Sequence, residues 1–279
     1  MEKKLFETVF INTRFKRHHF EALADREGFL VAGIDEVGRG PGAGPVLAAA
    51  VVLHPGKRHP LLKDSKILTA DQRAKAYTWL LQNSWHGWAS ISAHCIDHNG
   101  IAEATKIAME RAFHNLCQVL TTVPTAVLVD AVPLSLPLRR DKNSPPDPFL
   151  SLCSKQLRSN LTEDQAESVL RNPRDKVIAF YYGEQQSRTI AAASIIAKVI
   201  RDQIMTTLAP LFPIYGFGDH KGYTTPAHRY AIDTYGISVL HRRVWKSNQM
   251  ATPSSATQDV PEASMPIFHE IPKDSKENY

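Results

Sequence analysis

Two neighbouring carboxylates, Asp35 and Glu36, stand at the end of an apolar run. Buried acids are unfavourable unless they are paired or bind a metal ion. The segment after them carries an arginine between two glycines, in the order Gly38, Arg39 and Gly40. Glycine lets the backbone approach a ligand closely, and the guanidinium can reach a phosphate. These residues therefore predict a metal site beside a phosphate site.

Two further acids follow apolar runs that are typical of buried strands. Asp130 ends the run 125–130, and Glu184 follows the run 176–182. Sites of open α/β sheets lie at the carboxyl ends of strands, so we expect these acids to meet Asp35 and its neighbour. Neighbours on a strand point to opposite faces, so Asp35 and Glu36 share the site only if the backbone turns there.

Four converging carboxylates repel one another unless divalent cations neutralise them. Hard oxygen ligands suit Mg²⁺ or Mn²⁺ rather than zinc. Two such ions clamp the attacking and leaving oxygens of a phosphodiester displacement. The acids therefore predict a metal-dependent nuclease.

The elements that must position these acids alternate between strand and helix, which predicts an α/β fold with a mixed central sheet of about five strands flanked by helices. The expected strands are 29–36, 45–53, 85–94, 125–130 and 176–182. The expected helices are 70–82, 101–120, 189–208 and 226–235, the last of which belongs to a C-terminal helical segment. A turn is expected at 97–100.

The chain has 279 residues, and its composition separates a body from two ends. Residues 1–28 are expected to be a helical extension, 29–246 the catalytic body and 247–279 a disordered acidic tail, with 134–174 as an insertion. The net charge of the chain is +5, and two lysines with five acids in the tail leave the body at +8. A basic body with an acidic tail favours a polyanionic partner.

Three cysteines, widely spaced, argue against a disulfide framework and a cysteine-based zinc site. The N-terminus carries acids and no long apolar core, so we expect no signal peptide. No apolar run approaches the length of a membrane span. We therefore expect a cytoplasmic protein without a membrane partner.

Several motifs, taken in order, resemble the ribonuclease HII family. They are Asp35-Glu36-Val37-Gly38-Arg39-Gly40-Pro41, Ala43-Gly44-Pro45-Val46, Asp64-Ser65-Lys66, Asp130, the run from Ala191 to Asp202, and His220-Lys221-Gly222-Tyr223. The resemblance implies an RNase H-like fold, a monomer and Mg²⁺- or Mn²⁺-dependent cleavage of RNA in RNA/DNA hybrids. It also implies incision 5′ to single ribonucleotides in duplex DNA, leaving a 3′ hydroxyl and a 5′ phosphate.

The family's roles transfer to matching positions of this chain. Asp35, Glu36 and Asp130 match metal-site acids, and the glycine-flanked Arg39 matches a turn that reads the 2′-hydroxyl, the group that distinguishes RNA from DNA. Tyr223 matches a tyrosine that stacks on the sugar of the next deoxynucleotide. The remaining expected substrate-binding residues are Lys66, Ser194 and Lys198. For the two lysines, a structural or solvated role is the alternative.

The chain departs from the family at Glu184, where an aspartate in a Lys-Gly-Asp context is usual, and at Thr224, where the family has glycine. The sister family, ribonuclease HIII, uses glutamate at the first position. The connection 134–174 is also long and is not expected to be covered by the resemblance. A degenerate metal site would instead give a non-catalytic hybrid-binding protein. Another RNase H-like nuclease, such as a resolvase, has no need for the Arg39 turn.

Two other features stay open in the sequence. Arg242-Arg243 is interpreted as a basic surface or as a partner of the acidic tail. Met265-Pro266-Ile267-Phe268 is interpreted as a peptide for a sliding clamp or, more simply, as an apolar patch in the tail.

Overall fold

The computed structural model describes residues 7–11, 15–130, 171, 176–245 and 248. Within them, the strands form one six-stranded sheet in the order β1-β6-β5-β2-β3-β4. The strands are β1 (Glu7–Phe10), β2 (Val31–Val37), β3 (Val46–Leu53), β4 (Ser84–Ile91), β5 (Ala126–Asp130) and β6 (Lys176–Phe180). The first four strands in this order are parallel to one another. β3 runs antiparallel to β2, and β4 runs antiparallel to β3. The mixed sheet confirms the expected fold class.

The strand β1 lies in the extension that we expected to be helical. It pairs in parallel with β6, with Glu7 opposite Lys176, and adds a sixth strand to the five that the sequence predicts. The β-branched and aromatic residues of this stretch suit a strand. Among the described residues of the extension, the helix is α1 (His19–Glu27), in the later part.

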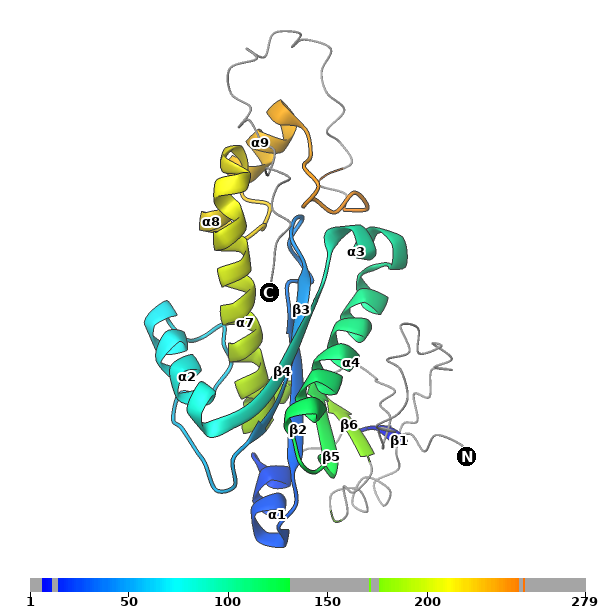
Figure 1. Cartoon of the computed structure of the whole chain (residues 1–279), viewed down its shortest axis with the longest axis vertical. Coiled ribbons are helices and arrows are strands. Elements are labelled where there is room, and N and C mark those ends of the chain that lie inside the picture. The colour runs from blue at the N-terminus through cyan, green and yellow to red at the C-terminus, as the bar shows by residue number, and fades with distance from the viewer. Residues whose placement is uncertain (1–6, 12–14, 131–170, 172–175, 246–247, 249–279) are drawn as a thin grey trace, which may run out of the picture.

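Two long helices cover the two faces of the sheet. α4 (Ile101–Val119) packs on one face and α7 (Arg188–Leu208) on the other, with β2 and β3 between them (Figure 1). Glycines permit the close approach: a Cβ at Gly33 would lie 2.2 Å from the carbonyl carbon of Thr189, and one at Gly87 would lie 2.2 Å from the backbone nitrogen of Leu116. The acids of β2 are therefore held in a rigid three-layer core.

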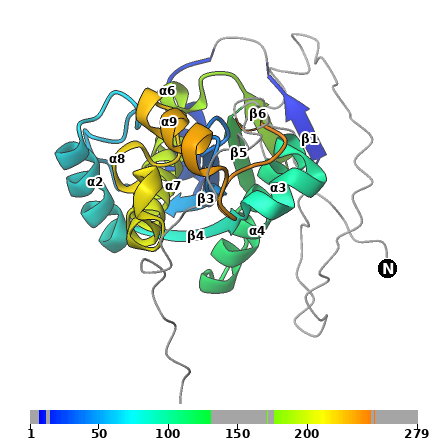
Figure 2. The ribbon, with the colours of Figure 1, turned by 90° about the horizontal axis from the view of Figure 1, so that it is seen from above.

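Shorter helices lie around this core. α2 (Ala70–Asn83) begins with a capping box at Thr69 and lies beside α7. The strand expected at 85–94 ends at Ile91, because the Ser92 side chain caps α3 (Ala93–Asn99), so the expected turn at 97–100 is mainly helix end. Figure 2 shows α2 and α7 on one side of β3 and β4, with α3 and α4 on the other.

The C-terminal helical segment continues from α7. It consists of the 3-10 turns η1 (Ala209–Leu211) and η2 (Pro213–Tyr215), α8 (Phe217–His220) and α9 (Pro226–Tyr235). The proposed insertion, the clamp-like peptide and the tail lie outside the described residues, apart from Arg171 and Asn248. The Asn248 amide donates to the carbonyls of Gly42 and Arg242 at 2.9 and 2.8 Å. No helix in the described ranges has the length and apolar character to cross a membrane.

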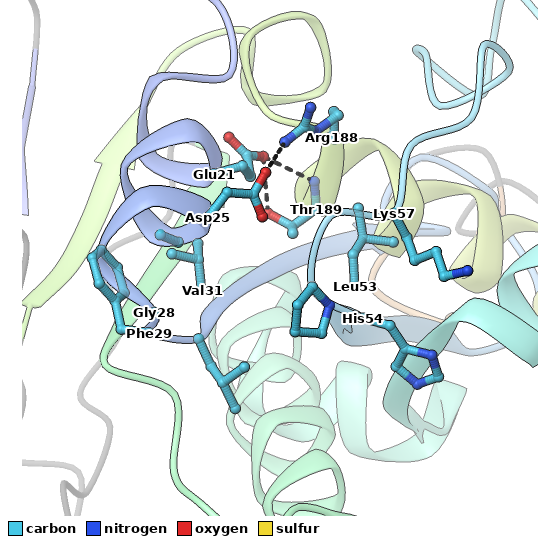
Figure 3. A pocket seen from close by; sticks show the side chains of 13 residues that line it. Glu21, Asp25, Gly28, Phe29, Val31, Leu53, His54, Lys57, Arg188 and Thr189 are labelled. Atoms are coloured by element: carbon cyan, nitrogen blue, oxygen red, sulfur yellow. Dashed lines mark hydrogen bonds and ion pairs between the residues drawn. The ribbon is translucent and has the colours of Figure 1, made fainter.

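The helix α1 is tied to the beginning of α7 (Figure 3). Glu21 is 5% exposed and accepts from the Ser187 hydroxyl at 2.7 Å and from the backbone N–H of Thr189 at 3.1 Å. Asp25 and Arg188 form an ion pair at 3.6 Å beside a cavity of about 150 Å³. This cavity lies at the start of β2, whereas the acids Asp35 and Glu36 lie at its other end.

Candidate active site

The expected acids come from three elements of the fold. Asp35 lies on β2 and is 5% exposed, and Asp130 is the last residue of β5. The pairing of Ile34 with Val129 places Asp130 next to Asp35 in register. The structure thus brings the strand-end acids together.

Glu184 does not follow a strand directly but lies on α6 (Gly183–Gln186), a single helical turn after β6. The backbone N–H of Gly183 donates to the Asp130 carboxylate at 3.2 Å, which joins this turn to β5. A Cβ at Gly183 would lie 3.1 Å from the Cβ of Asp130, so the small residue permits the approach. Glu184 is 9% exposed and reaches the other acids.

The acids strongly affect one another. Burial, followed by the charges of Glu36 and Glu184, raises the pKa of Asp35 well above its usual value. Burial is also the first cause that raises the pKa of Glu36, of Asp130 and of Glu184. The side chains of Asp35 and Glu184 therefore lie within interaction distance of each other. A cluster of this kind holds protons that a divalent cation would displace.

The backbone does not turn at Asp35 and Glu36, although the sequence made such a turn the condition for a shared site. Both residues are regular members of β2, paired with Ala49 and Ala48 of β3, and the positive φ of 90° comes at Gly38. Their side chains therefore leave the strand on opposite faces. Because β5 ends beside Asp35, the longer Glu36 is still close enough to Asp130 for the charge of Asp130 to raise the pKa of Glu36.

Asp64, which sequence reasoning did not assign to the site, belongs to this cluster. Its carboxyl lies within interaction distance of that of Glu184 and accepts from the backbone N–H of Lys66 at 2.9 Å. The charge of Glu184, ahead of Asp64 and Asp35, raises the pKa of Lys66. The signal was present, because the Asp64-Ser65-Lys66 motif was recognised and only its lysine was assigned.

Ser194 was expected to contact the substrate, but its position indicates another role. Its side chain is 4% exposed, and its hydroxyl donates to the Glu184 carboxylate. The Ser65 hydroxyl lies 2.8 Å from that of Ser194. We correct the expectation: these hydroxyls orient Glu184 from behind. Lys198 forms an ion pair with Asp202 at 2.8 Å along α7, which fits the structural alternative for this lysine.

The backbone of the glycine-rich turn is held by a buried arginine. Arg242 is fully buried and donates to the carbonyls of Gly38, Arg39 and Gly44 at distances of 2.5 to 3.0 Å. The interpretation of Arg242 as a basic surface or a partner of the tail is therefore wrong. Its guanidinium leaves the carbonyls no freedom to rotate, and the turn is fixed before any ligand arrives.

The side chain of Arg39 itself points into solvent. It is 48% exposed and lies 3.5 Å from the carboxylate of Glu36. An exposed guanidinium beside the acids is available to a phosphate, as the sequence predicts. Tyr223 is 45% exposed, and its ring lies 3.9 Å from where a Cβ at Gly40 would be. The turn and the tyrosine are thus neighbours.

A buried chain of histidines supports the backbone of Tyr223. Nδ1 of His241 accepts from the backbone N–H of Ser238 at 2.9 Å, so a neutral His241 carries its proton on Nε2. That Nε2 lies 3.0 Å from Nε2 of His228. The Nδ1–H of His228 donates to the carbonyl of Tyr223 at 2.9 Å. This series of hydrogen bonds is complete only while both imidazole rings are neutral.

The donor set fits a hard divalent cation, because it consists of carboxylate oxygens with an excess of negative charge. In the described ranges, no three histidine, cysteine, aspartate or glutamate side chains are already arranged as a metal cage. Metal binding at this site therefore requires the carboxyl side chains to rearrange, and a bound cation would displace the protons that their raised pKa values favour.

Comparisons with known proteins agree with this geometry. The family model described as Ribonuclease HII matches residues 32–146 and 151–248. It therefore runs through most of 134–174, which we expected it not to cover. The curated Ribonuclease HII of Rhizobium meliloti (strain 1021) is 40% identical over 224 residues, which cover 80% of this chain and 86% of the relative.

Solved structures share the fold. The ribonuclease H2 from Pyrococcus horikoshii OT3 superposes with a TM-score of 0.52 at 23% identity, covering 79% of this chain and 95% of that one. Bst-RNase HIII in complex with Mn²⁺ superposes with a TM-score of 0.53 at 18% identity, covering 83% and 72%. At these identities the likeness concerns the fold alone.

Proposed function

The chain belongs to the ribonuclease HII family and is a ribonuclease H, and from this premise we propose that it incises duplex DNA 5′ to embedded ribonucleotides as well as cleaving RNA in RNA/DNA hybrids. The products are a 3′ hydroxyl and a 5′ phosphate. The observation that carries the proposal is the position of the Arg39 turn, which lies between the acid cluster and Tyr223. A nuclease that ignored the 2′-hydroxyl would have no use for this arrangement.

We propose that Asp35, Glu36, Asp130 and Glu184 hold two Mg²⁺ or Mn²⁺ ions. Bound there, the ions would supply an activated water and charge stabilisation for the leaving 3′ oxygen. Support comes from the oxygen-only donor set, from its raised pKa values, and from the Mn²⁺ complex of Bst-RNase HIII.

Glu184 keeps its place in the cluster despite its additional methylene. The one-turn helix α6 sets its backbone, and the hydroxyl of Ser194 fixes one carboxylate oxygen. Its contact with Asp35 supports a complete set of four acids rather than the degenerate site of a non-catalytic binding protein. Lys66 offsets part of the negative charge.

The remaining residues bind and orient the substrate. The main chain of the Arg39 turn, fixed by Arg242, offers groups to the ribose 2′-hydroxyl, and the exposed guanidinium takes a phosphate. The half-exposed ring of Tyr223 packs on the next sugar and tests that it lacks a hydroxyl. Together these residues define a ribonucleotide–deoxyribonucleotide junction.

A labelled DNA duplex with one ribonucleotide tests the proposal. The duplex is incubated with the protein in Mg²⁺, in Mn²⁺ and in EDTA. We expect metal-dependent incision 5′ to the ribonucleotide, lost in Asp130→Asn and Glu184→Gln. The exposed acids give matched controls, Asp71→Asn and Glu27→Gln, which should cut normally.

Two outcomes would contradict the proposal. Normal incision by Glu184→Gln would place the fourth ligand elsewhere. Cleavage of a uniform hybrid without any incision at a single ribonucleotide would remove junction reading from this enzyme.

A further inference from the structure

Arg201 joins the two segments that carry the proposed substrate-reading groups. It lies on α7, its side chain is fully buried, and its nitrogens donate to the carbonyls of Ala43 at 3.2 Å and Pro45 at 2.9 Å. A third donor reaches the carbonyl of Lys221 at 3.0 Å, two residues before Tyr223. One guanidinium therefore bonds to two segments: the glycine-rich turn, residues 38–45, and the tyrosine loop, residues 220–223.

The two segments also touch each other directly. The backbone N–H of Ala43 donates to the carbonyl of Gly222 at 3.2 Å, and a Cβ at Gly222 would lie 2.3 Å from the Ala43 oxygen. A Cβ at Gly38 would lie 2.2 Å from Nε of Arg201, so the guanidinium lies directly behind the glycine-rich turn. The relative position of turn and tyrosine is thus set by Arg201 from within.

We propose that Arg201 is a positioning residue that determines the preference for a ribonucleotide–deoxyribonucleotide junction over a continuous hybrid. The inference rests on the proposed function. Reading a junction requires two tests one nucleotide apart, a hydroxyl present at the first sugar and absent at the second. A planar guanidinium with donors in a fixed fork holds two segments at a set spacing, which a flexible ammonium does not.

The acids are placed without Arg201. They lie on β2, β5 and α6, and none of the hydrogen bonds of Arg201 goes to them. In a continuous hybrid every nucleotide of the RNA strand offers a hydroxyl, so a small displacement of Tyr223 changes the cleavage of a hybrid less than it changes incision at a junction. Loss of the Arg201 guanidinium should therefore slow incision at a junction more than it slows cleavage of a hybrid.

The test uses Arg201→Lys in the full-length protein, with Met205→Ala as the matched control. Met205 lies one turn further along α7 and is fully buried; its sulfur lies 2.4 Å from a Cβ placed at Gly44. Its truncation loosens packing at the same place and leaves the hydrogen bonds of Arg201 in place. Urea unfolding measures how far each variant is destabilised.

The readout is kcat/KM on a single-ribonucleotide duplex divided by kcat/KM on a uniform RNA/DNA hybrid. We expect this ratio to fall about tenfold to a hundredfold in Arg201→Lys, because small misplacements have effects of this size, and to stay unchanged in Met205→Ala. In a Tyr223→Ala background, Arg201→Lys should change the ratio no further.

Equal loss on both substrates, or the same change of ratio in Met205→Ala, would overturn the inference and leave Arg201 a structural residue. Arg201→Gln, which is neutral and keeps a planar donor, replaces Arg201→Lys if the lysine variant does not fold. Failure of the wild-type protein to incise at a single ribonucleotide would instead refute the proposed function.

Discussion

Replacing His241 with glutamine should make the protein less sensitive to acid. Burial, and then the neighbouring His228, lowers the pKa of His241 from 6.5 to about 4. A proton added to Nδ1 of His241 would face the backbone N–H of Ser238, which is 2.9 Å away. The folded protein therefore resists the proton that the unfolded chain accepts.

The sign and size follow from this difference. In the unfolded chain the ring titrates near 6.5, so the unfolded state binds more protons as the pH falls from 6.5 towards 4. The contribution of His241 to stability is complete above pH 6.5 and is lost progressively below it. Between pH 7.5 and pH 5, this one ring should lower the free energy of unfolding by about 2 kcal/mol.

Urea unfolding at pH 7.5 and pH 5 measures the effect. His241→Gln should be about 1–2 kcal/mol less stable than wild type at pH 7.5, because buried hydrogen bonds are lost. This gap should shrink by about 2 kcal/mol at pH 5. The exposed His94→Gln is the control, with no gap at either pH. A gap for His241→Gln that is the same at both pH values would refute the reasoning.

Three further outcomes are expected. Arg242→Met leaves three main-chain carbonyls without donors and should lower the free energy of unfolding in urea by about 3–6 kcal/mol. A loss below about 1 kcal/mol would contradict the conclusion that Arg242 holds the turn. Gly87→Ala drives a Cβ into α4 and should destabilise by at least about 2 kcal/mol, whereas Gly56→Ala, with open space around it, should cost about 1. Asp35→Asn removes the repulsion between the Asp35 charge and the neighbouring carboxylates, so without metal it should raise Tm, by about 2–4 °C for each kcal/mol gained in the free energy of unfolding. The same variant should lose the rise in Tm that Mn²⁺ gives the wild type.

The strand-end acids could be predicted because apolar runs show directly where buried strands end. Asp35 and Asp130 each follow such a run, and parallel pairing of β2 with β5 brings their carboxyls to one edge. Local signals also predicted α2, whose cap at Thr69 lies within the same few residues as the helix it begins. The same holds for α7, which is marked by a run of small apolar residues, and for α9, which is marked by Pro226 at its first position.

Other features depend on contacts between distant parts of the chain. Arginine is usually found on the surface, and only the folded chain shows that Arg201 and Arg242 are buried among main-chain carbonyls. Asp64 joins the acids through Glu184, far along the sequence. No periodicity carries this information, because the partners of these side chains are backbone atoms or carboxyls of other segments.

The edge strand β1 has a consequence for the order in which the chain assembles during synthesis. Its residues leave the ribosome long before those of β6, yet Glu7 pairs with Lys176. At 5–20 residues per second, the nascent strand waits about 10–30 s for β6 to be made. Until then its edge hydrogen-bonding groups are open to other chains. Substitutions that weaken β1 should therefore lower the folding yield during synthesis more than they lower the yield of refolding from urea, where both strands are present from the start.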